Sequence, residues 1–541
     1  MNLGIDFGST YTVVSTYRKD LKTAEALDAS EASPYLPSEV SVRGDKVEVG
    51  KAAKSQNGKK GTRCYKGFKM LLSVEDPEVR KSRGYDEVYT PEKVTELFLD
   101  RTVCQILSDS HQETVENLVI CAPEIWRKDI NTIDARTKLR DITRAFPYVR
   151  NVKIVSEPAA ASAYFAWNYY KQTGTPYRGN ILLIDYGGGT LDITVTNVST
   201  NTKNEKILME ILPLERTGAG ENREGKIGSA GIVFMETVTA RAIREAGIDR
   251  SEEELLEDPH FFKAVNELEE ALQSMTQTIT DAYDEFGYEE LNADDLDEDE
   301  NEFTSIFYRG EDIPITYSLM MEVYRGEIAP VLRSTLEEMF SLMDARGIHY
   351  RNPEQGDFKV ALVGGFGNFC LVDHQIQEML GWGSLIRQKA GFALGRGDRE
   401  KAVSLGAALL AEGVIDIRRT APYSIGIYAT HDGKERFQYA FHKGQDIEFD
   451  RVYYPCTAEG AVVPYLISSI DRFILRFDGE RKKDIVATLK PAFRRRMRQE
   501  LGGNDGPTLG SIGFSLDSSE CLHMHFKHYN LRTRRLEGEE T

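Results

Sequence analysis

The chain has 541 residues, of which 41% are hydrophobic and 28% charged, and its formal net charge is -19. That length exceeds what one hydrophobic core usually organises, so the composition predicts a globular protein of two or more domains. The excess of acidic residues disfavours a large nucleic-acid-binding surface, because phosphate binding needs clustered Lys and Arg.

No apolar stretch approaches the roughly 18 residues of a membrane-spanning helix, and the N-terminus lacks the pattern of a signal peptide. We therefore expect a cytoplasmic protein with no membrane partner. The six cysteines are scattered, with no CxxC pair and no His at zinc-ligand spacing, and this pattern predicts buried free thiols. They are Cys64, Cys104, Cys121, Cys370, Cys456 and Cys521.

The chain opens with an apolar run and a polar turn, and the same pattern returns near residue 185. Residues 3–10 read LGIDFGST, and residues 182–190 read LLIDYGGGT, with one extra glycine. Each copy predicts a buried strand that delivers an aspartate, a turn of Gly, Ser or Thr, and a second strand. The repeat therefore predicts two similar lobes that face one another.

Helices and strands alternate around these copies. Residues 90–107 predict a helix with Pro91 in its first turn, and residues 117–121 predict a strand. Residues 262–283 predict one long amphipathic helix. The acidic segment 284–302 lacks apolar periodicity and predicts a solvated loop.

The two turns contain the residue types that bind a nucleoside triphosphate. Glycine lets the backbone approach phosphate closely, and N–H groups and hydroxyls meet its oxygens. Carboxylates nearby, here Asp6 and Asp185, can hold a hydrated Mg²⁺. The candidate phosphate-binding residues are Gly8, Ser9, Thr10, Gly187, Gly188, Gly189 and Thr190.

A third glycine turn follows another predicted buried strand, residues 360–363. At Gly364 and Gly365 a flat base or ribose can lie against bare backbone. A single glycine-rich turn is equally typical of an ordinary tight hairpin. Two related copies with the aspartate in the same place favour the nucleotide site over that alternative.

Residues 1–415 resemble the ATPase domain of Hsp70 chaperones, within the actin, hexokinase and Hsp70 superfamily. The matching segments run in the family's order: residues 5–11, 35–38, 49–53, 68–71, 156–161, 185–192, 363–365 and 398–408. The resemblance implies an α/β fold with a two-lobed, actin-like (RNase H-like) ATPase domain. It also implies slow ATP hydrolysis, with ATP or ADP, Mg²⁺ and K⁺ as ligands.

The resemblance assigns roles to individual residues. Asp6, Glu157 and Asp185 would arrange the water shell of Mg²⁺ and the attacking water. Lys69 would lie beside the γ-phosphate and offset the charge that develops during phosphoryl transfer. An ordinary surface lysine is the alternative for Lys69.

Further positions complete the implied sites. Asp398 belongs to the nucleotide-binding set. Tyr11, Thr190 and Asp192 match positions that hold K⁺ in the family, and the implied metal-binding carboxylates are Asp6, Asp185 and Asp192.

Pro123 matches a proline that switches between nucleotide states in the family, although a proline that simply ends a strand is equally consistent. The basic residue expected after it is out of register, with Arg127 and Lys128 as candidates.

The segment that clamps the adenine departs from the family's pattern. Glu269 and Glu270 stand where the family has Lys and Arg. Either the base is held differently, or its affinity is reduced, or both glutamates are exposed helix residues.

After Arg419 the sequence changes to short alternating runs. Residues 512–516 and 522–526 alternate around a turn at 517–520, which predicts a hairpin in a small all-β domain. This part resembles the Hsp70 peptide-binding β-sandwich. We divide the chain into an ATPase domain (1–415), a linker (416–421) and a β-sandwich (422–541) without a helical lid. A β-domain that binds no peptide is the alternative.

Together these patterns predict an ATP-dependent chaperone that couples hydrolysis to the binding of peptide or unfolded protein clients. The resemblance implies a J-domain co-chaperone and a nucleotide exchange factor as partners. A nucleotide-gated scaffold or adaptor for one dedicated partner, with weak or no ATPase activity, is the alternative. An actin-like filament protein fits less well, because such proteins do not usually carry the appended β-domain.

Overall fold

The computed structural model describes most of the chain. The described residues are all except 30–32, 130, 201–205, 213–217, 220–229, 257, 289–297, 353, 355, 384–390, 392–393, 432–433, 457–461, 463–464, 467–471, 479–481, 489–508, 530–535 and 541. They form helices and several sheets, so the predicted mixed α/β class is confirmed.

The chain divides into two compact units. Unit 1 comprises Met1–Glu124 and Lys138–Asp416, and unit 2 comprises Ile125–Thr137 and Ile417–Thr541. The predicted division at residue 415 placed residues 125–137 in the first domain. In the structure they group with unit 2 instead.

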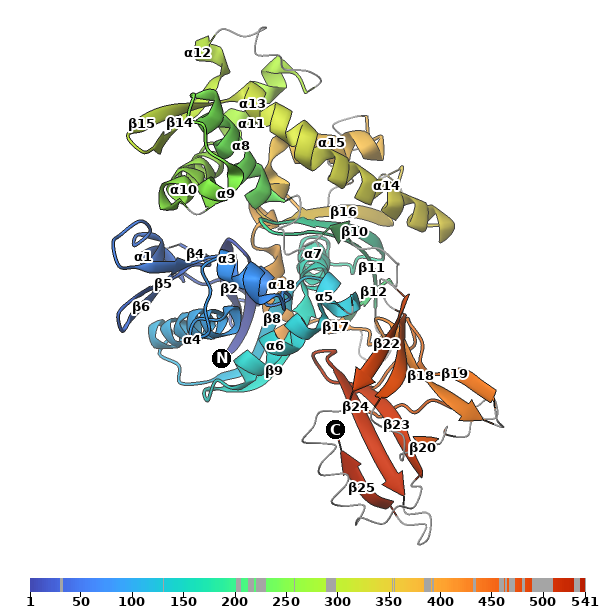
Figure 1. Cartoon of the computed structure of the whole chain (residues 1–541). Coiled ribbons are helices and arrows are strands. Elements are labelled where there is room, and N and C mark those ends of the chain that lie inside the picture. Colours follow the sequence, from blue (N-terminus) through green and yellow to red (C-terminus); the bar gives the residue numbers. More distant parts are fainter. Residues whose placement is uncertain are drawn as a thin grey trace. The chain divides into compact units, whose positions relative to one another are not determined.

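The first sheet of unit 1 contains the first copy of the repeated motif (Figure 1). Its strand order is β3-β2-β1-β8-β9, with β4 beside β2. β1 and β2 are antiparallel, whereas β8 is parallel to β1 and β9 is parallel to β8. The strands are β1 (Asn2–Phe7), β2 (Tyr11–Arg18), β3 (Thr23–Ala26), β4 (Tyr35–Pro37), β8 (Val115–Ala122) and β9 (Val149–Ser156).

The second sheet contains the second copy in the same arrangement. Its order is β16-β10-β11-β12-β17, with β13 beside β11. β10 and β11 are antiparallel, and β16 is parallel to β10. The sequence repeat is therefore also a repeat of strand pairing. The strands are β10 (Gly179–Tyr186), β11 (Leu191–Thr200), β12 (Ile207–Ile211), β13 (Gly218–Ala219), β16 (Phe358–Val363) and β17 (Asp416–Ile417).

Two helices join these sheets. Helix α7 (Glu157–Thr173) packs against β10, β11 and β12, and α18 (Ala402–Glu412) packs against β1, β2 and α7. A Cβ built at Gly406 would lie 1.7 Å from the carbonyl oxygen of Ala160, so only glycine permits this helix crossing. Ser404 accepts a hydrogen bond from Ser15 of β2 at 2.8 Å, which fixes α18 on the first sheet.

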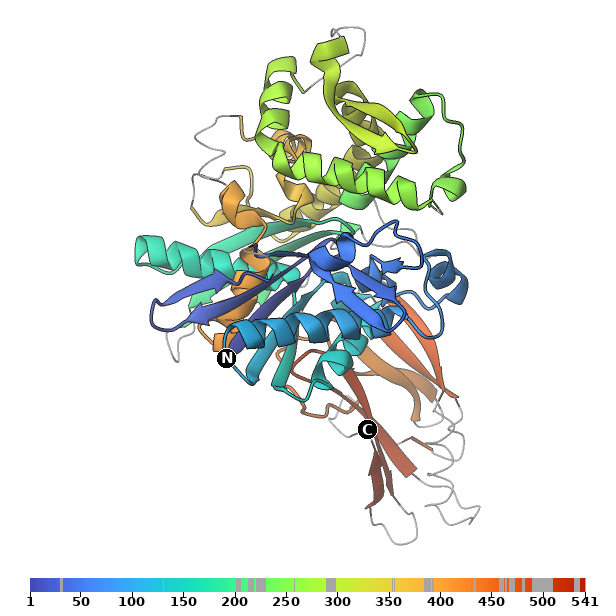
Figure 2. The same cartoon turned by 90° about the vertical axis from the view of Figure 1, so that its left-hand side faces the viewer.

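Helix α4 (Pro91–Asp109) lies beside the first sheet, whose strands β1 to β4 are blue in Figure 2. It confirms the helix predicted for residues 90–107, and Thr90 caps it by accepting a hydrogen bond from the Lys93 N–H. The Phe98 ring centroid lies 6.1 Å from that of Phe7 in β1. This aromatic contact ties the helix to the strand that delivers Asp6.

The prediction of one helix over residues 262–283 is wrong. Helices α10 (Pro259–Ser274) and α11 (Thr276–Phe286) are separated at Met275. Hydroxyls on either side bond back to the backbone, Ser274 to the Glu270 carbonyl and Thr276 to that of Leu272, and such bonds compete with helix continuation.

The acidic segment 284–302 is only partly a loop. Its first residues belong to α11, and residues 298–301 form α12, after which β14 begins. Residues 289–297 lie outside the described residues. The predicted strand at 117–121 is confirmed as part of β8.

The remaining elements of unit 1 include a three-stranded sheet, in the order β6-β5-β7, and a two-stranded sheet, β14-β15. The strands are β5 (Val40–Arg43), β6 (Lys46–Val49), β7 (Arg63–Tyr65), β14 (Glu302–Tyr308) and β15 (Glu311–Thr316). The early helices are α1 (Gly50–Lys54), α2 (Phe68–Leu71) and α3 (Pro77–Ser82). The later ones are α8 (Gly231–Glu245), α9 (Glu252–Leu256), α12 (Glu298–Asn301), α13 (Tyr317–Val323), η2 (Tyr324–Ile328), α14 (Ala329–Ala345), η4 (Phe366–Asn368), α15 (Cys370–Leu380) and α17 (Arg396–Arg399).

Unit 2 contains two four-stranded sheets, in the orders β19-β18-β21-β22 and β20-β23-β24-β25. Side chains from both sheets, among them Ile427, Phe477 and Phe514, form one apolar cluster. The predicted hairpin is confirmed as β23 and β24. The strands are β18 (Ser424–His431), β19 (Lys434–Phe441), β20 (Tyr465–Leu466), β21 (Arg472–Asp478), β22 (Lys482–Thr488), β23 (Leu509–Leu516), β24 (Leu522–Tyr529) and β25 (Leu536–Glu540).

Residues 125–137 bring two buried arginines into unit 2. They form α5 (Ile125–Lys128) and the first residues of α6 (Ile133–Arg144), whose remainder belongs to unit 1. Arg127 Nε donates to Glu520 Oε2 at 2.6 Å, and Arg136 Nε donates to the Ser519 carbonyl at 2.6 Å. The turn of the β23–β24 hairpin therefore holds this segment through charged hydrogen bonds.

All six cysteines are free thiols, as predicted, but burial is confirmed only for Cys121, Cys370 and Cys521, since Cys64 and Cys456 are partly exposed and Cys104 is exposed. In the described part of the chain, no helix has both the length and the hydropathy of a membrane crossing.

Candidate functional site

Three carboxylates lie where strands of the two sheets end. Asp6 precedes the last residue of β1, Asp185 precedes the last residue of β10, and Glu157 opens α7 directly after β9. The carboxyl ends of parallel strands meet at one edge of a sheet, and ligands of α/β proteins bind in the crevice outside that edge. The arrangement explains why single residues so far apart in sequence can act on one another.

Lys69 lies among these carboxylates. It is only 4% exposed, and its Nζ donates a hydrogen bond to Glu157 Oε1 at 2.6 Å. The alternative of an ordinary surface lysine is therefore wrong. Burial opposes a charge on this side chain, but the negative charges of Glu157 and Asp6 outweigh it and raise the pKa of Lys69.

The carboxylates repel one another in a buried setting. Burial, followed by the charge of Glu157, raises the pKa of Asp6 to about 7, although Lys69 lowers it in part. Burial, followed by Glu157 and Asp6, also raises the pKa of Asp185 well above its ordinary value. One lysine does not neutralise this cluster, so a bound cation would stabilise its ionised form.

The glycine turns of the two repeated motifs face each other directly. A Cβ built at Gly188 would lie 2.4 Å from Thr10 Oγ1, and one built at Gly189 would lie 2.9 Å from Ser9 Oγ. A side chain at either glycine would displace the opposite hydroxyl. The structure thus brings the two predicted phosphate turns together.

Gly364 adds a third backbone segment to this region. It has a φ of +83°, a value that favours glycine, and a Cβ there would lie 2.7 Å from Asp185 Oδ1. No atom of the described residues lies within 4 Å of a Cβ built at Gly365.

The polar groups of the site fit a hydrated cation with a polyphosphate. Thr10 Oγ1 is buried and has no hydrogen-bond partner among the described residues, and the same holds for Thr194 Oγ1 and Ser156 Oγ. Buried hydroxyls are normally paired, so the unpaired Thr10 hydroxyl, which lies against Gly188 of the opposite turn, fits a site that a ligand or water completes. No three His, Cys, Asp or Glu side chains in the described ranges converge as a direct metal site.

The other predicted site residues lie around this centre. Asp192 faces Asp185 across the β10–β11 ladder. The Gly8 carbonyl accepts the Ser38 hydroxyl at 2.7 Å, and the Gly187 N–H donates to the Thr190 carbonyl at 3.0 Å.

Two predicted residues contact other groups. The Tyr11 ring packs edge-on against Tyr35 and lies 6.0 Å from the Lys54 ammonium. Asp398 accepts a hydrogen bond from the Tyr164 hydroxyl at 3.1 Å.

The two glutamates of α10 behave differently from each other. Glu270 is exposed and pairs with Lys54 at 3.0 Å, as the exposed-helix alternative predicts. Glu269 is only 8% exposed, and burial raises its pKa against the opposing charges of Lys54 and Lys66. The alternative of an exposed helix residue is therefore wrong for Glu269.

Cys121 is a further neighbour of the site, which the sequence motifs did not identify. It pairs with Asp6 in the parallel β1–β8 ladder, and burial, followed by the charge of Asp6, raises the pKa of its thiol. Its position at the end of a predicted strand was the available signal.

Comparison with known proteins gives one family match. A model described as "Hsp70 protein" matches residues 2–203. The chain is 25% identical over 219 residues to a heat shock protein of Pyricularia oryzae, a match that covers 36% of this chain and 34% of the relative. It is 24% identical over 219 residues to "Heat shock 70 kDa protein" of Neurospora crassa, covering 36% and 32%.

A third relative is a ribosome-associated molecular chaperone of Zygosaccharomyces rouxii, which is 22% identical over 220 residues and matched over 36% of this chain and 34% of its own. The chain thus spans about a third of the length of the curated relatives it matches. The predicted resemblance to the Hsp70 family is therefore confirmed, and it is carried by residues 2–203.

Proposed function

We propose that unit 1 binds ATP between its two glycine turns and hydrolyses it slowly. The observation that carries this proposal is the group of buried Glu157 and Asp185 and partly buried Asp6 around the buried Lys69, beside turns that meet through Thr10 and Gly188. Repeated strand pairing in the two sheets supports a two-lobed, actin-like domain. The matched Hsp70 family model supports the choice of ATP as the ligand.

Each residue of the site has its own role in the proposed hydrolysis. Lys69 lies where its charge can offset charge that develops on the transferred phosphoryl group. Glu157 and Asp185 orient the attacking water, and the raised pKa of Asp185 makes it a better proton acceptor than an ordinary carboxylate. Mg²⁺, held through water by Asp6 and Asp185, would neutralise phosphate charge. Tyr11, Thr190 and Asp192 remain the proposed K⁺ positions.

We propose that unit 2 is a β-sandwich that binds extended peptide. Its two sheets pack their apolar side chains into one cluster, and strand addition or pockets between strands would receive a client. The names of the matched relatives, heat shock proteins and a ribosome-associated molecular chaperone, support a chaperone function. A J-domain co-chaperone, a nucleotide exchange factor and a cytoplasmic location belong to this proposal.

Calorimetric titration with ATP and ADP, with and without Mg²⁺, followed by a turnover assay on the same sample, tests the proposal. We expect Mg²⁺-dependent binding and a slow turnover that an unfolded peptide accelerates. Asp185→Asn should keep the fold and lower turnover by at least about a hundredfold. Binding without turnover, together with one stoichiometric partner in a pull-down, would support the adaptor alternative. No nucleotide binding would refute both.

A further inference from the structure

The helix that carries Lys69 is too short to fix that residue by itself. Helix α2 has four residues, and its N-cap, Gly67, is in the left-handed conformation and offers no side-chain cap. A single turn of helix is not stable alone, because the entropy lost in fixing its backbone exceeds the free energy that its few hydrogen bonds contribute. The position of Lys69 therefore depends on contacts at the two ends of α2.

The first end of α2 is held by apolar packing. Phe68 is 1% exposed, and its ring centroid lies 5.4 Å from Phe98 and 5.9 Å from Phe7. These contacts fix the side of the helix that precedes Lys69. They leave the last carbonyl groups of α2 to find other partners.

The second end of α2 is held by Lys138. The Leu72 N–H donates to the Lys69 carbonyl at 3.2 Å, and the Leu72 carbonyl accepts a hydrogen bond from Lys138 Nζ at 3.1 Å. A cation is the favoured partner for carbonyls at a helix C-terminus. Lys138 is therefore two hydrogen bonds away from the backbone of Lys69.

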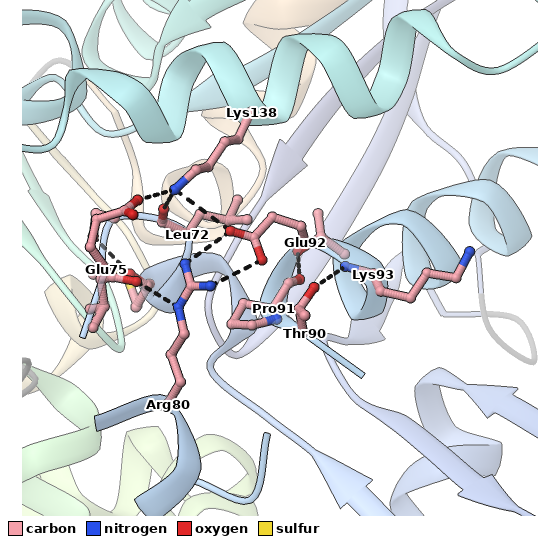
Figure 3. Close-up of polar contacts among 12 residues, drawn as sticks. Leu72, Glu75, Arg80, Thr90, Pro91, Glu92, Lys93 and Lys138 are labelled. Carbon is pink, nitrogen blue, oxygen red and sulfur yellow. Dashed lines mark hydrogen bonds and ion pairs between the residues drawn. The ribbon is translucent and has the colours of Figure 1, made fainter. Parts of the chain in front are cut away.

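Lys138 is itself kept in place by carboxylates (Figure 3). Its Nζ lies 2.5 Å from Glu75 and 3.6 Å from Glu92. Glu92 also pairs with Arg80 at 2.9 Å, and Arg80 Nε donates to the Val74 carbonyl at 2.6 Å. Glu92 thus contacts both Lys138 and Arg80. Each of these two side chains donates a hydrogen bond to a backbone carbonyl in the segment directly after α2.

The contacts in this cluster differ in how much they contribute to holding Lys138 in place. The Glu75 side chain is 76% exposed, so its pair with Lys138 contributes little. Lys138 and Glu92 are 20% and 27% exposed, and Leu72 is fully buried. The bond to the Leu72 carbonyl is therefore the contact that distinguishes Lys138 from a lysine in a surface ion pair.

We propose that Lys138 is a positioning residue for Lys69, acting through the Leu72 carbonyl, with Glu92 holding Lys138 and Arg80 against the segment after α2. The proposal rests on the ATPase function proposed above. It assigns Lys138 no contact with the nucleotide. Loss of this residue should therefore impair turnover while leaving nucleotide affinity largely intact.

The test compares Lys138→Met with Lys93→Met in the full chain. Lys93 pairs only with exposed Glu96 among the described residues, so it controls for loss of a lysine in the same region. We expect faster hydrogen exchange of the amides of residues 68–74 in Lys138→Met alone. Its kcat should fall about tenfold and its KM for ATP should stay within about twofold. Lys138→Arg, which keeps a charged donor, should recover most of the turnover.

Three outcomes would overturn the proposal: unchanged exchange in residues 68–74, unchanged kcat despite faster exchange, or a rise in KM that accounts for the whole effect. If Lys138→Met does not fold, Lys138→Gln, which retains a neutral donor, takes its place. An inactive wild-type chain would refute the ATPase function instead. The exchange comparison would then still decide whether Lys138 holds α2.

Discussion

Lys69 and Glu157 form an ion pair that solvent hardly reaches, with side chains 5% and 6% exposed. Removing one partner of such a pair leaves the other charge buried without compensation, and this costs more than the pair contributes. The stability of unit 1 and the chemistry of the site are therefore linked in the same two side chains.

We predict that Lys69→Met lowers the free energy of unfolding by about 3 kcal/mol, and that adding Glu157→Gln restores most of it. Turnover should fall more than ATP affinity in both variants. Urea unfolding of the two single variants and the double variant measures the coupling. Additive losses would show that the two side chains do not depend on each other.

If unit 1 binds a nucleotide as proposed, Asp6 makes that binding depend on pH. Its pKa is about 7 in the folded chain against 3.8 for the ordinary group, so its contribution to stability is present at acid pH and is lost as the pH rises toward about 7. Binding of Mg²⁺ with ATP favours the ionised carboxylate. We therefore predict release of about half a proton from Asp6 at pH 7.

Calorimetric titrations in two buffers of different ionisation enthalpy measure this proton release. Asp6→Asn provides the control, because it has no proton to lose, and its proton count should be smaller than that of the wild type. Equal counts in the two proteins would assign the proton to another group.

For individual residues, the sequence predicted the site positions that follow from local spacing. Asp6 and Asp185 each lie two residues before a glycine of their own turn, so the repeat alone identified them. Lys69 was found only through the family resemblance, since no periodicity marks it. The burial of Glu269 could not be predicted, because its neighbours Lys54 and Lys66 come from another part of the chain.

Among the glycines that the structure describes, Gly406, at the crossing of α7 and α18, has the shortest distance from a built Cβ to a neighbouring atom. The neighbour of Gly406 is the backbone carbonyl of Ala160, which no change of rotamer can move. Any side chain at Gly406 must therefore push the two helices, and the sheets on which they pack, apart.

We predict that Gly406→Ala lowers the free energy of unfolding by about 3 kcal/mol, at the upper end of the usual cost of overpacking. Gly326→Ala is the control, since Gly326 is exposed and a Cβ there meets no atom of the described part of the chain within 4 Å. That variant should be neutral or more stable by up to about 1 kcal/mol. Thermal and urea unfolding compare the two, and equal stabilities would contradict the packing argument.

Elements with their own start and stop signals were predicted well. Thr90 and Pro91 mark the start of α4, and the residues 517–520 mark the β23–β24 turn. The break between α10 and α11 was missed, because the apolar pattern continues across Met275 and no Gly or Pro interrupts it. Its cause lies in hydroxyl-to-carbonyl bonds that a periodic pattern does not report.

For the whole molecule, the division into units was the least accessible to sequence reasoning. Arg127 and Arg136 are 5% and 1% exposed, and their shared carboxylate, Glu520, is separated from them by 393 and 384 residues. No local pattern marks residues 125–137 as part of a β-rich unit. Their membership follows from contacts with distant residues, among them the hairpin turn, the Thr420 carbonyl and the apolar cluster against which Ile133 packs.

We predict that Glu520→Gln destabilises unit 2 by about 3 kcal/mol, because two buried guanidinium groups lose their carboxylate. Glu448→Gln is the control: this glutamate is 74% exposed and pairs with Arg451, so its loss should cost less than about 0.5 kcal/mol. Hydrogen exchange should quicken in residues 125–137 only in the first variant. Equal protection in both would show that the arginines do not need Glu520.

Because residues 125–137 belong to unit 2, the order of synthesis affects when that unit can fold. A ribosome releases Arg136 383 residues before Ser519, whose carbonyl it binds. Throughout that interval the nascent segment must stay accessible, although the chain on both sides of it can already fold. Unit 2 thus combines a segment that is synthesised early with a hairpin that is synthesised late. A translation product that stops short of the hairpin lacks the Glu520 carboxylate and the Ser519 carbonyl, which Arg127 and Arg136 contact in the full chain.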